Sequence, residues 1–131
     1  MATIELTEAN IEDTINDNDI VLIDFWADWC GPCKQFGPIF EAASEKYADV
    51  AFAKCDTEKE QVLAAQFGIR SIPTLAVFRE KILLLAQPGA LPGSALDEII
   101  EKVKELDMDD VRKQIEEHMA AQDAQGGEQP A

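Results

Sequence analysis

The chain has 131 residues, 47% of them hydrophobic, so it is long enough to bury a core and is expected to form one main domain. Its 26 acidic and 11 basic residues give a formal net charge of −15, which argues against binding to the nucleic-acid backbone or to an anionic membrane surface. A soluble, monomeric, acidic protein is expected instead.

The N-terminal segment and the cysteine content favour the cytoplasm. The first ten residues, MATIELTEAN, lack the basic and apolar regions of a secretory signal. The longest apolar runs, residues 20–23 and 82–86, are far too short to cross a membrane. Three cysteines, an odd number, do not resemble the disulfide framework of a secreted protein. A reducing cytoplasm is therefore expected, and a secreted form that has lost its signal is the alternative.

The first half of the chain predicts two strands that alternate with two helices. Residues 3–6 alternate in polarity, as in a short edge strand, and Thr7 is expected to cap a helix that ends near residue 16. Residues 20–26 (IVLIDFW) contain a single charge, which predicts a central strand covered on both faces. The next segment, residues 33–47, has apolar residues at helical spacing.

The second half predicts three further strands and two helices. Residues 50–55 indicate a buried strand, and residues 57–66 indicate a helix. Residues 74–78 and 81–87 predict the two strands of a tight hairpin, and Ser94 is expected to cap the helix that follows. Because the first three long strands are separated by helices and the last two are not, we expect an α/β fold. Its sheet is mixed and five-stranded, with helices on both faces.

The composition changes near residue 106, where the main domain, residues 1–106, is expected to end. Residues 107–131 carry seven acidic and two basic residues. The first part, residues 107–121, predicts an additional acidic helix. The last part, residues 122–131 (QDAQGGEQPA), has almost no large apolar side chains and is predicted to be disordered.

A Cys-x-x-Cys motif lies where the predicted strand of residues 20–26 gives way to a helix, and its residues are Cys30, Gly31, Pro32 and Cys33. A thiolate at a helix N-terminus is stabilised by the helix dipole and by free backbone N–H groups. Glycine allows a close approach in the turn, and proline sets φ for the first helical turn. This context predicts a redox-active pair of cysteines.

Two other interpretations of the cysteine pair remain open at this point. The pair could be buried and inert, or it could form half of a zinc site. A structural zinc site usually needs four nitrogen or sulfur ligands, and the remaining candidates are Cys55, on a predicted strand, and His118, in the extension. Cys55 itself is interpreted as a small buried hydrophobic residue, with a regulatory thiol as the alternative.

Asp24 is the only charged residue in an otherwise apolar strand. Burial of a charged carboxylate is unfavourable by roughly several kcal/mol unless the group is paired or protonated. Asp24 therefore either faces the sheet edge or solvent, or is a base of raised pKa that takes the proton of Cys33, directly or through a water molecule. Lys54, in the middle of the strand VAFAKC, is the natural partner of Asp24, and a solvated lysine is the alternative.

These motifs together resemble the thioredoxin family. The resemblance extends over residues 3–106, and its segments occur in the family's order: Asp24-Phe25-Trp26-Ala27, Trp29-Cys30-Gly31-Pro32-Cys33, Lys54, Gly68-Ile69-Arg70, Ile72-Pro73-Thr74 and Gly89-Ala90. It implies a thioredoxin-like fold and a protein-disulfide oxidoreductase, an electron carrier in cell redox homeostasis. A departure is the hairpin turn of residues 79–81, which lacks the glycine usual in the family.

The resemblance also implies a role for each site residue. Cys30, with an exposed sulfur, would attack the substrate and Cys33 would resolve the mixed disulfide, so that the two form a reversible disulfide. Asp24 would accept the proton of Cys33, tuned by Lys54, and Pro73 would follow a cis peptide bond opposite the cysteines. An apolar docking surface would surround Cys30, lined by Trp29, Ile72, Gly89 and Ala90.

The resemblance implies partners rather than bound groups. No metal or cofactor of the chain's own is expected, and electrons would come from NADPH through the flavoprotein thioredoxin reductase. Disulfide-containing proteins would be the substrates. Two alternatives are a disulfide oxidant or isomerase on the same fold, and a non-catalytic module that uses the fold for binding or assembly.

Overall fold

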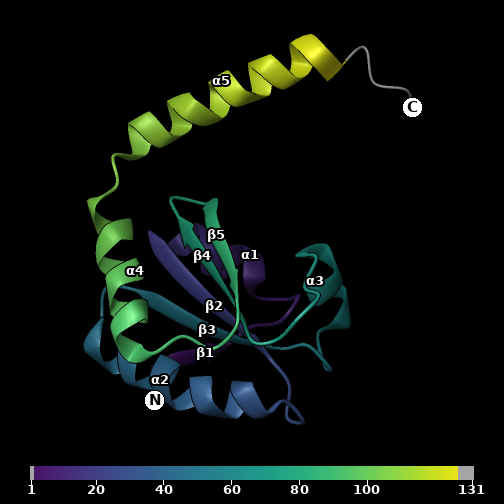
Figure 1. Ribbon diagram of the computed structural model, residues 1–131, viewed down its shortest axis with the longest axis vertical. Coiled ribbons are helices and arrows are strands. Elements are labelled where there is room, and N and C mark those ends of the chain that lie inside the picture. Colours follow the sequence, from purple (N-terminus) through teal and green to yellow (C-terminus); the bar gives the residue numbers. More distant parts are fainter. Residues whose placement is uncertain (1, 127–131) are drawn as a thin grey trace. The chain divides into compact units, whose positions relative to one another are not determined.

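The computed structural model describes residues 2–126, which form five strands and five helices in the order shown in Figure 1. The elements are β1 (Thr3–Glu5), α1 (Ile11–Asp17), β2 (Ile20–Trp26), α2 (Gly31–Lys46), β3 (Ala51–Asp56), α3 (Gln61–Gln66), β4 (Thr74–Arg79), β5 (Ile82–Pro88), α4 (Gly93–Glu105) and α5 (Met108–Gly126).

The strands form one mixed sheet in the order β1-β3-β2-β4-β5, which confirms the predicted five-stranded α/β architecture. Strand β2 runs parallel to β3, and β3 runs parallel to β1. Strands β4 and β5 continue the sheet in antiparallel pairing. The position of β2 in the middle of this order explains why almost every residue in its sequence is apolar.

Helices cover both faces of the sheet, as predicted. Helix α1 and the segment around α3 pack on one face, where Phe67 lies 5.2 Å from Phe25 between ring centroids. Helix α2 packs on the opposite face, where Phe40 lies 5.1 Å from Phe52 of β3. Because side chains alternate along a strand, the β2 residues that flank Phe25 point toward α2. One of these residues is Asp24.

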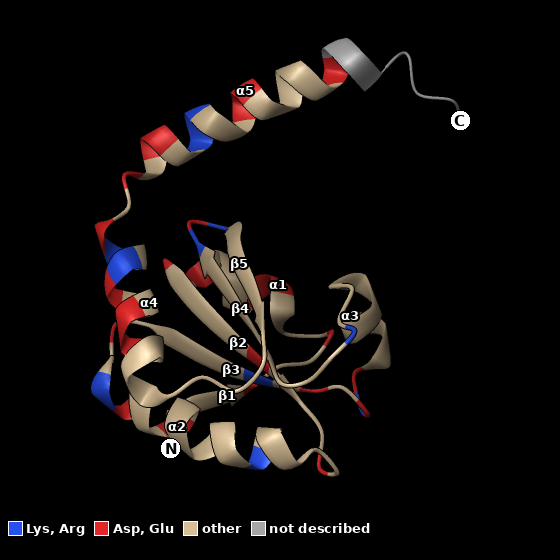
Figure 2. Cartoon of the chain, in the orientation of Figure 1, with Lys and Arg blue, Asp and Glu red and all other residues tan. Residues whose placement is uncertain are grey.

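Two charged side chains therefore lie inside a largely apolar sheet. The strands in Figure 2 are mostly uncharged, and the exceptions within β2 and β3 include Asp24 and Lys54. These two residues are direct neighbours in the parallel register of β2 and β3. On the other side, Asp24 is opposite the apolar residue Leu75 of β4. The sheet thus brings the carboxylate and the ammonium to the same face, next to α2.

Helix α1 begins later than the sequence predicted. Thr7 was expected to cap it, but the first helical residue is Ile11, and residues 7–10 form a turn instead. The side chain of Asn10 stabilises this turn, because its oxygen accepts a hydrogen bond from Thr7 N at 2.8 Å and its nitrogen donates to Glu5 O at 2.8 Å. Such local side-chain bonds compete with helix formation.

Helix α3 also begins later than predicted, at Gln61 rather than near residue 57. Thr57 donates a hydrogen bond from both its backbone nitrogen and its hydroxyl to Trp26 O, at 2.9 and 3.0 Å. Asp56 Oδ1 accepts from Glu58 N at 2.9 Å, which closes a turn. The segment that should have opened the helix is therefore tied to the end of β2.

The C-terminal helix α5 runs past its predicted end at residue 121, to Gly126. Its polar side chains pair along the helix, for example Gln114 Nε2 with Asp110 Oδ2 at 2.8 Å. Residues 127–131, the end of the predicted disordered segment, lie outside the described residues. Within residues 2–126 no helix combines the length and the apolar character that a membrane span requires.

Two residues of the β4–β5 turn adopt the left-handed backbone conformation, with φ of 49° at Glu80 and 71° at Lys81. Two-residue hairpin turns favour Asn-Gly for this reason. We expect Lys81→Gly to raise the free energy of unfolding by about 0.5–1 kcal/mol, because relief of the left-handed strain exceeds the added freedom of the unfolded chain. Urea unfolding measures the change. Lys81→Ala, which keeps the Cβ atom, is the control, and equal stability of the two variants would contradict this explanation.

Candidate active site

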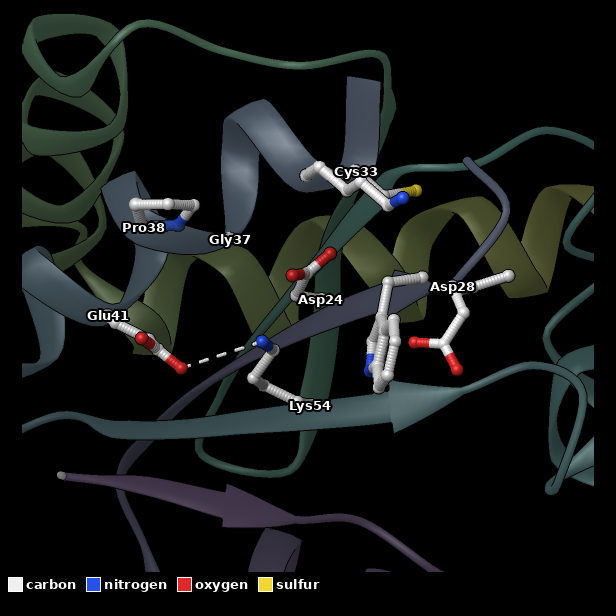
Figure 3. Close-up of a pocket in the computed structure, with 10 residues that line it drawn as sticks. Asp24, Asp28, Cys33, Gly37, Pro38, Glu41 and Lys54 are labelled. Carbon is white, nitrogen blue, oxygen red and sulfur yellow. Dashed lines mark ion pairs between the residues drawn. The ribbon is translucent and has the colours of Figure 1, made fainter. Parts of the chain in front are cut away.

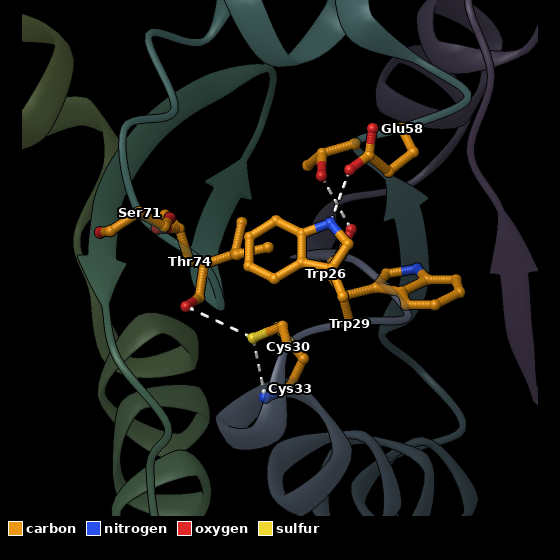
Figure 4. Close-up of a disulfide and its surroundings, with 9 residues drawn as sticks. Trp26, Trp29, Cys30, Cys33, Glu58, Ser71 and Thr74 are labelled. Atoms are coloured by element: carbon orange, nitrogen blue, oxygen red, sulfur yellow. Dashed lines mark hydrogen bonds between the residues drawn. A yellow bond between two sulfur atoms is a disulfide. The ribbon is translucent and has the colours of Figure 1, made fainter.

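The two cysteines form a disulfide at the N-terminus of α2 (Figure 4), with a Cα–Cα distance of 5.2 Å. Cys30 is the N-cap residue, and its sulfur accepts a hydrogen bond from Cys33 N at 3.2 Å. Gly31 and Pro32 fill the first two helical positions, so α2 begins two residues before the predicted start at residue 33, and Pro32 lies in the first helical turn as predicted. The free N–H groups and the dipole of a 16-residue helix therefore point at the Cys30 sulfur, where they would stabilise a thiolate.

The prediction that the Cys30 sulfur is exposed does not hold for the disulfide form. Cys30 and Cys33 are each 4% exposed. The two residues differ in their surroundings rather than in their exposure. The Cys30 sulfur lies 3.6 Å from Ile72 O, at the rim of the loop before β4. Cys33 lines a cavity on the other side, together with Asp24.

The predicted docking surface begins at Trp29, whose side chain is 70% exposed. Its indole N–H donates a hydrogen bond to Glu58 Oε1 at 2.6 Å (Figure 4). A groove of about 290 Å³ lies beside Trp29 and continues to Ile72. The exposed ring is thus fixed in place next to the disulfide by a residue of the β3–α3 loop.

The loop before β4 contributes the remaining predicted residues. The Ile72–Pro73 peptide bond is cis, as the resemblance implied. Ile72 is half-buried, and Gly89 and Ala90 are exposed. Gly89 N donates to Pro73 O at 2.8 Å, which brings the end of β5 to this loop. The backbone carbonyl of Ile72 lies beside the Cys30 sulfur, where an extended substrate segment could pair with the Ile72 backbone.

Asp24 lies at the bottom of a cavity of about 230 Å³ that Cys33 also lines (Figure 3). Its side chain is fully buried, and neither carboxylate oxygen is hydrogen-bonded to any group of residues 2–126. The pKa of Asp24 is raised from 3.8 to about 7, chiefly because burial disfavours the charged form; the positive charge of Lys54 lowers it, and the negative charge of Glu41 raises it. A carboxyl of this pKa can gain and lose a proton near neutral pH.

Lys54 does not form the direct pair with Asp24 that the sequence suggested. Its ammonium forms an ion pair with Glu41 Oε1 at 3.6 Å, and it lies 5.2 Å from the centre of the Trp26 ring. Trp26 is half-buried and lines the same cavity. Lys54 therefore acts on Asp24 through its charge, while its ion pair is with α2.

Sequence reasoning missed Glu41 and Glu58. Glu41 could have been found from its spacing, because Cys33, Gly37 and Glu41 are four residues apart and share one face of α2. All three line the cavity. Glu58 carried none, since its bond to Trp29 joins two loops that are distant in the sequence.

The arrangement does not support the zinc interpretation. Within residues 2–126, no three side chains of the His, Cys, Asp and Glu types are grouped so that they could hold a metal ion. Cys55 is free and fully buried. Burial raises the pKa of its thiol to about 12, with smaller contributions from the charges of Glu60, Asp56 and Asp24. The interpretation of Cys55 as a small buried hydrophobic residue is confirmed.

Comparison with known proteins gives one consistent family. The sequence profile of the family described as Thioredoxin matches residues 2–105. A relative from Streptomyces coelicolor named "Putative thioredoxin 2" is 55% identical over 119 residues, which cover 91% of this chain and 89% of the relative. That match is long enough to continue into the C-terminal extension. Thioredoxin of Porphyra purpurea is 38% identical over 104 residues, which cover 78% and 97% of the two chains.

Solved structures agree with the sequence comparison. A mutant thioredoxin from Halobacterium salinarum is similar with a TM-score of 0.72 and 38% identity, over 79% of this chain and 90% of that one. A thioredoxin from Plasmodium falciparum is similar with a TM-score of 0.70 and 32% identity, over 78% and 98% of the two chains. The family match over residues 2–105 includes all five strands, helices α1, α2 and α3, and the cysteine pair.

Proposed function

The chain belongs to the thioredoxin family and is a protein-disulfide reductase that acts by dithiol–disulfide exchange, and we propose that Cys30 attacks, Cys33 resolves and Asp24 accepts the proton of Cys33. One observation carries the assignment of unequal roles. The Cys30 sulfur lies at the helix N-terminus beside Ile72 O, whereas Cys33 lines the cavity of a buried carboxylate. Each cysteine is thus adjacent to the group that its step requires.

The first step consumes a substrate disulfide. The Cys30 thiolate of the reduced chain attacks one sulfur of the substrate, and a Cys30–substrate disulfide forms as the substrate S–S bond breaks. The other substrate sulfur leaves as a thiolate and takes a proton from solvent. The helix dipole favours the attacking thiolate, because it lowers the pKa of a thiol at this position.

The second step releases the substrate. The Cys33 thiol gives its proton to the Asp24 carboxylate, directly or through a water molecule in the cavity, and the resulting thiolate attacks the Cys30 sulfur. The Cys30–Cys33 disulfide forms, and the second substrate sulfur leaves as a thiolate that is then protonated. Two electrons have passed to the substrate, and the chain is left in the oxidised form that the structure shows.

Substrate docking is assigned to the exposed surface around Cys30. Trp29 offers an exposed ring, and Ile72 offers backbone groups beside the sulfur, so a substrate strand could pair there in extended conformation. Gly89 and Ala90 have small side chains or none, which would let a substrate backbone approach closely. The surface is apolar and close to the cysteines, and any exposed disulfide segment could use it.

The oxidised pair must be reduced again before the next turnover. We assign this step to thioredoxin reductase with NADPH as the electron source, so that residues 1–106 would carry the whole redox function and would need no bound cofactor. Residues 107–131 are then an appendage to the domain. A reducing cytoplasm is the compartment consistent with the free thiol of Cys55.

We expect the chain to link NADPH oxidation to insulin reduction in the presence of a thioredoxin reductase. Loss of absorbance at 340 nm, measured against released insulin thiols, should give one NADPH for each disulfide reduced, since both couples carry two electrons. Omission of the chain is the control. If dithiothreitol supports insulin reduction through the chain but several bacterial reductases do not, the exchange chemistry stands and the assigned electron donor is wrong.

A further inference from the structure

Glu41 is a further ionisable residue at the Asp24 cavity, and neither of the two steps above uses it. It lies on α2, two turns after Cys33, and its carboxylate oxygen Oε1 is 3.6 Å from Lys54 Nζ. Figure 3 shows the Lys54 ammonium between the two acids, with its ion pair directed at Glu41. The pair is partly exposed, at 24% for the Lys54 side chain and 36% for Glu41, whereas Asp24 is fully buried.

We propose that Glu41 is a positioning residue, which holds the Lys54 ammonium on the solvent side of the cavity and so prevents it from pairing with the Asp24 carboxylate. The inference deepens the proposed function, because its kinetic consequence rests on Asp24 as the proton acceptor. Its structural part, the competition of two acids for one lysine, stands without that role.

The register of the sheet makes this competition inevitable. Asp24 and Lys54 are direct neighbours on parallel strands, and both side chains face α2. A lysine side chain is flexible enough to turn toward either acid. A buried carboxylate without a hydrogen-bond donor is a strong attractor for a nearby ammonium. The Lys54 ammonium nevertheless forms its ion pair with Glu41 and leaves the Asp24 oxygens without a hydrogen bond to residues 2–126. We therefore attribute the position of the ammonium to the Glu41 carboxylate.

The charges around Asp24 come from three segments. Lys54 is on β3, Glu41 and Lys34 are on α2, and Asp28 follows β2. The neighbour on β4, Leu75, is uncharged. Of these groups, Lys54 lowers the pKa of Asp24 and Glu41 raises it. Glu41 therefore acts twice in the same direction, through its own negative charge and through the position of Lys54.

The consequence concerns the strength of the base. If Lys54 paired directly with Asp24, the pKa of that carboxyl would fall, because an adjacent positive charge favours the ionised form. A weaker base accepts the proton of Cys33 less readily. The resolving step would then become slower at neutral pH, and its pH dependence would move to lower pH. With Lys54 held by Glu41, Asp24 keeps a pKa at which it can bind the proton.

The test is Glu41→Gln, which removes the charge and keeps the size of the side chain. In this variant the titration midpoint of Asp24, followed by carboxyl-carbon NMR of the full chain, should fall by about one pH unit or more. Glu45→Gln is the matched control, because Glu45 is exposed, lies on the same helix and undergoes the same change of charge. The control should leave the titration unchanged.

A double-mutant cycle separates positioning from direct repulsion. In a Lys54→Gln background, Glu41→Gln should shift the Asp24 titration by less than half as much, because no ammonium remains to move. An unchanged Asp24 titration in Glu41→Gln would overturn the inference, and so would equal shifts in both backgrounds. If the titration shifts as expected while the rate of mixed-disulfide resolution does not, the proposed role of Asp24 fails and the positioning by Glu41 stands.

Discussion

Cys33→Ser is expected to lose nearly all turnover, because each chain is held after its first attack as a one-to-one mixed disulfide with the substrate. Cys30 keeps its place at the N-terminus of α2, so the first step remains available. The intramolecular thiol that should release the substrate is gone. Neighbouring groups reach effective concentrations of about 10⁵ M or more, so replacement by external thiol should lower steady-state insulin reduction by more than about a thousandfold.

Insulin reduction with dithiothreitol measures the loss, and non-reducing gel electrophoresis detects the trapped complex. Cys55→Ser is the control, because the Cys55 thiol is fully buried and lines neither the groove beside Trp29 nor the Asp24 cavity. This variant should retain near-native activity and trap nothing. Normal turnover by Cys33→Ser would contradict the assignment of Cys33 as the resolving thiol.

Asp24→Asn is expected to make the protein more stable above neutral pH. The pKa of Asp24 is raised from 3.8 to about 7 by burial. Between about pH 4 and pH 7 the folded chain therefore holds a proton that the unfolded chain has lost, and the stability of the native protein falls as pH rises through this window. A difference of about three pH units corresponds to about 4 kcal/mol.

Asparagine carries no charge at any pH, so the variant lacks this decline. At pH 8 its free energy of unfolding should exceed that of the native chain by up to about 4 kcal/mol, and the difference should disappear toward pH 4. Urea unfolding of both oxidised proteins at the two pH values gives the numbers. Equal stability at pH 8 would show that Asp24 is not a buried acid with a raised pKa.

The same substitution should cost activity, which explains why an unfavourable group is kept in the sheet. Loss of a positioned base typically slows its step by about a hundredfold or more. The slowing should appear in the resolution of the mixed disulfide and not in the first attack by Cys30. Asp24→Asn would then combine higher stability with slower release of the substrate.

The sequence predicted the framework of the site because that framework is local or follows from strand patterns. The apolar strand with a single aspartate, and the cysteine pair at its junction with a helix, are both readable from consecutive residues. Alternation along β2 then places Asp24 on the face that α2 covers. The mixed sheet followed from the spacing of strands and helices along the chain.

The features that could not be predicted depend on which residues, distant in the sequence, come into contact in the folded chain. Lys54 has two acids within reach, and only the packing of α2 on the sheet decides that its ion pair is with Glu41. The burial of the Cys30 sulfur depends on the loop at Ile72, forty-two positions away in the sequence. The late start of α1 depends on one side chain, Asn10, whose hydrogen bonds favour a turn over a helix.

The division of labour between the cysteines is tested most directly by locating the attacked sulfur. Cys30→Ser and Cys33→Ser are treated side by side with an aromatic disulfide such as 5,5′-dithiobis(2-nitrobenzoate), and the adducts are mapped by peptide mass spectrometry. A rapid adduct on Cys30 is expected in Cys33→Ser, and a much slower reaction at Cys33 is expected in Cys30→Ser. Equally rapid modification of Cys33 would contradict the assignment of Cys30 as the attacking thiol.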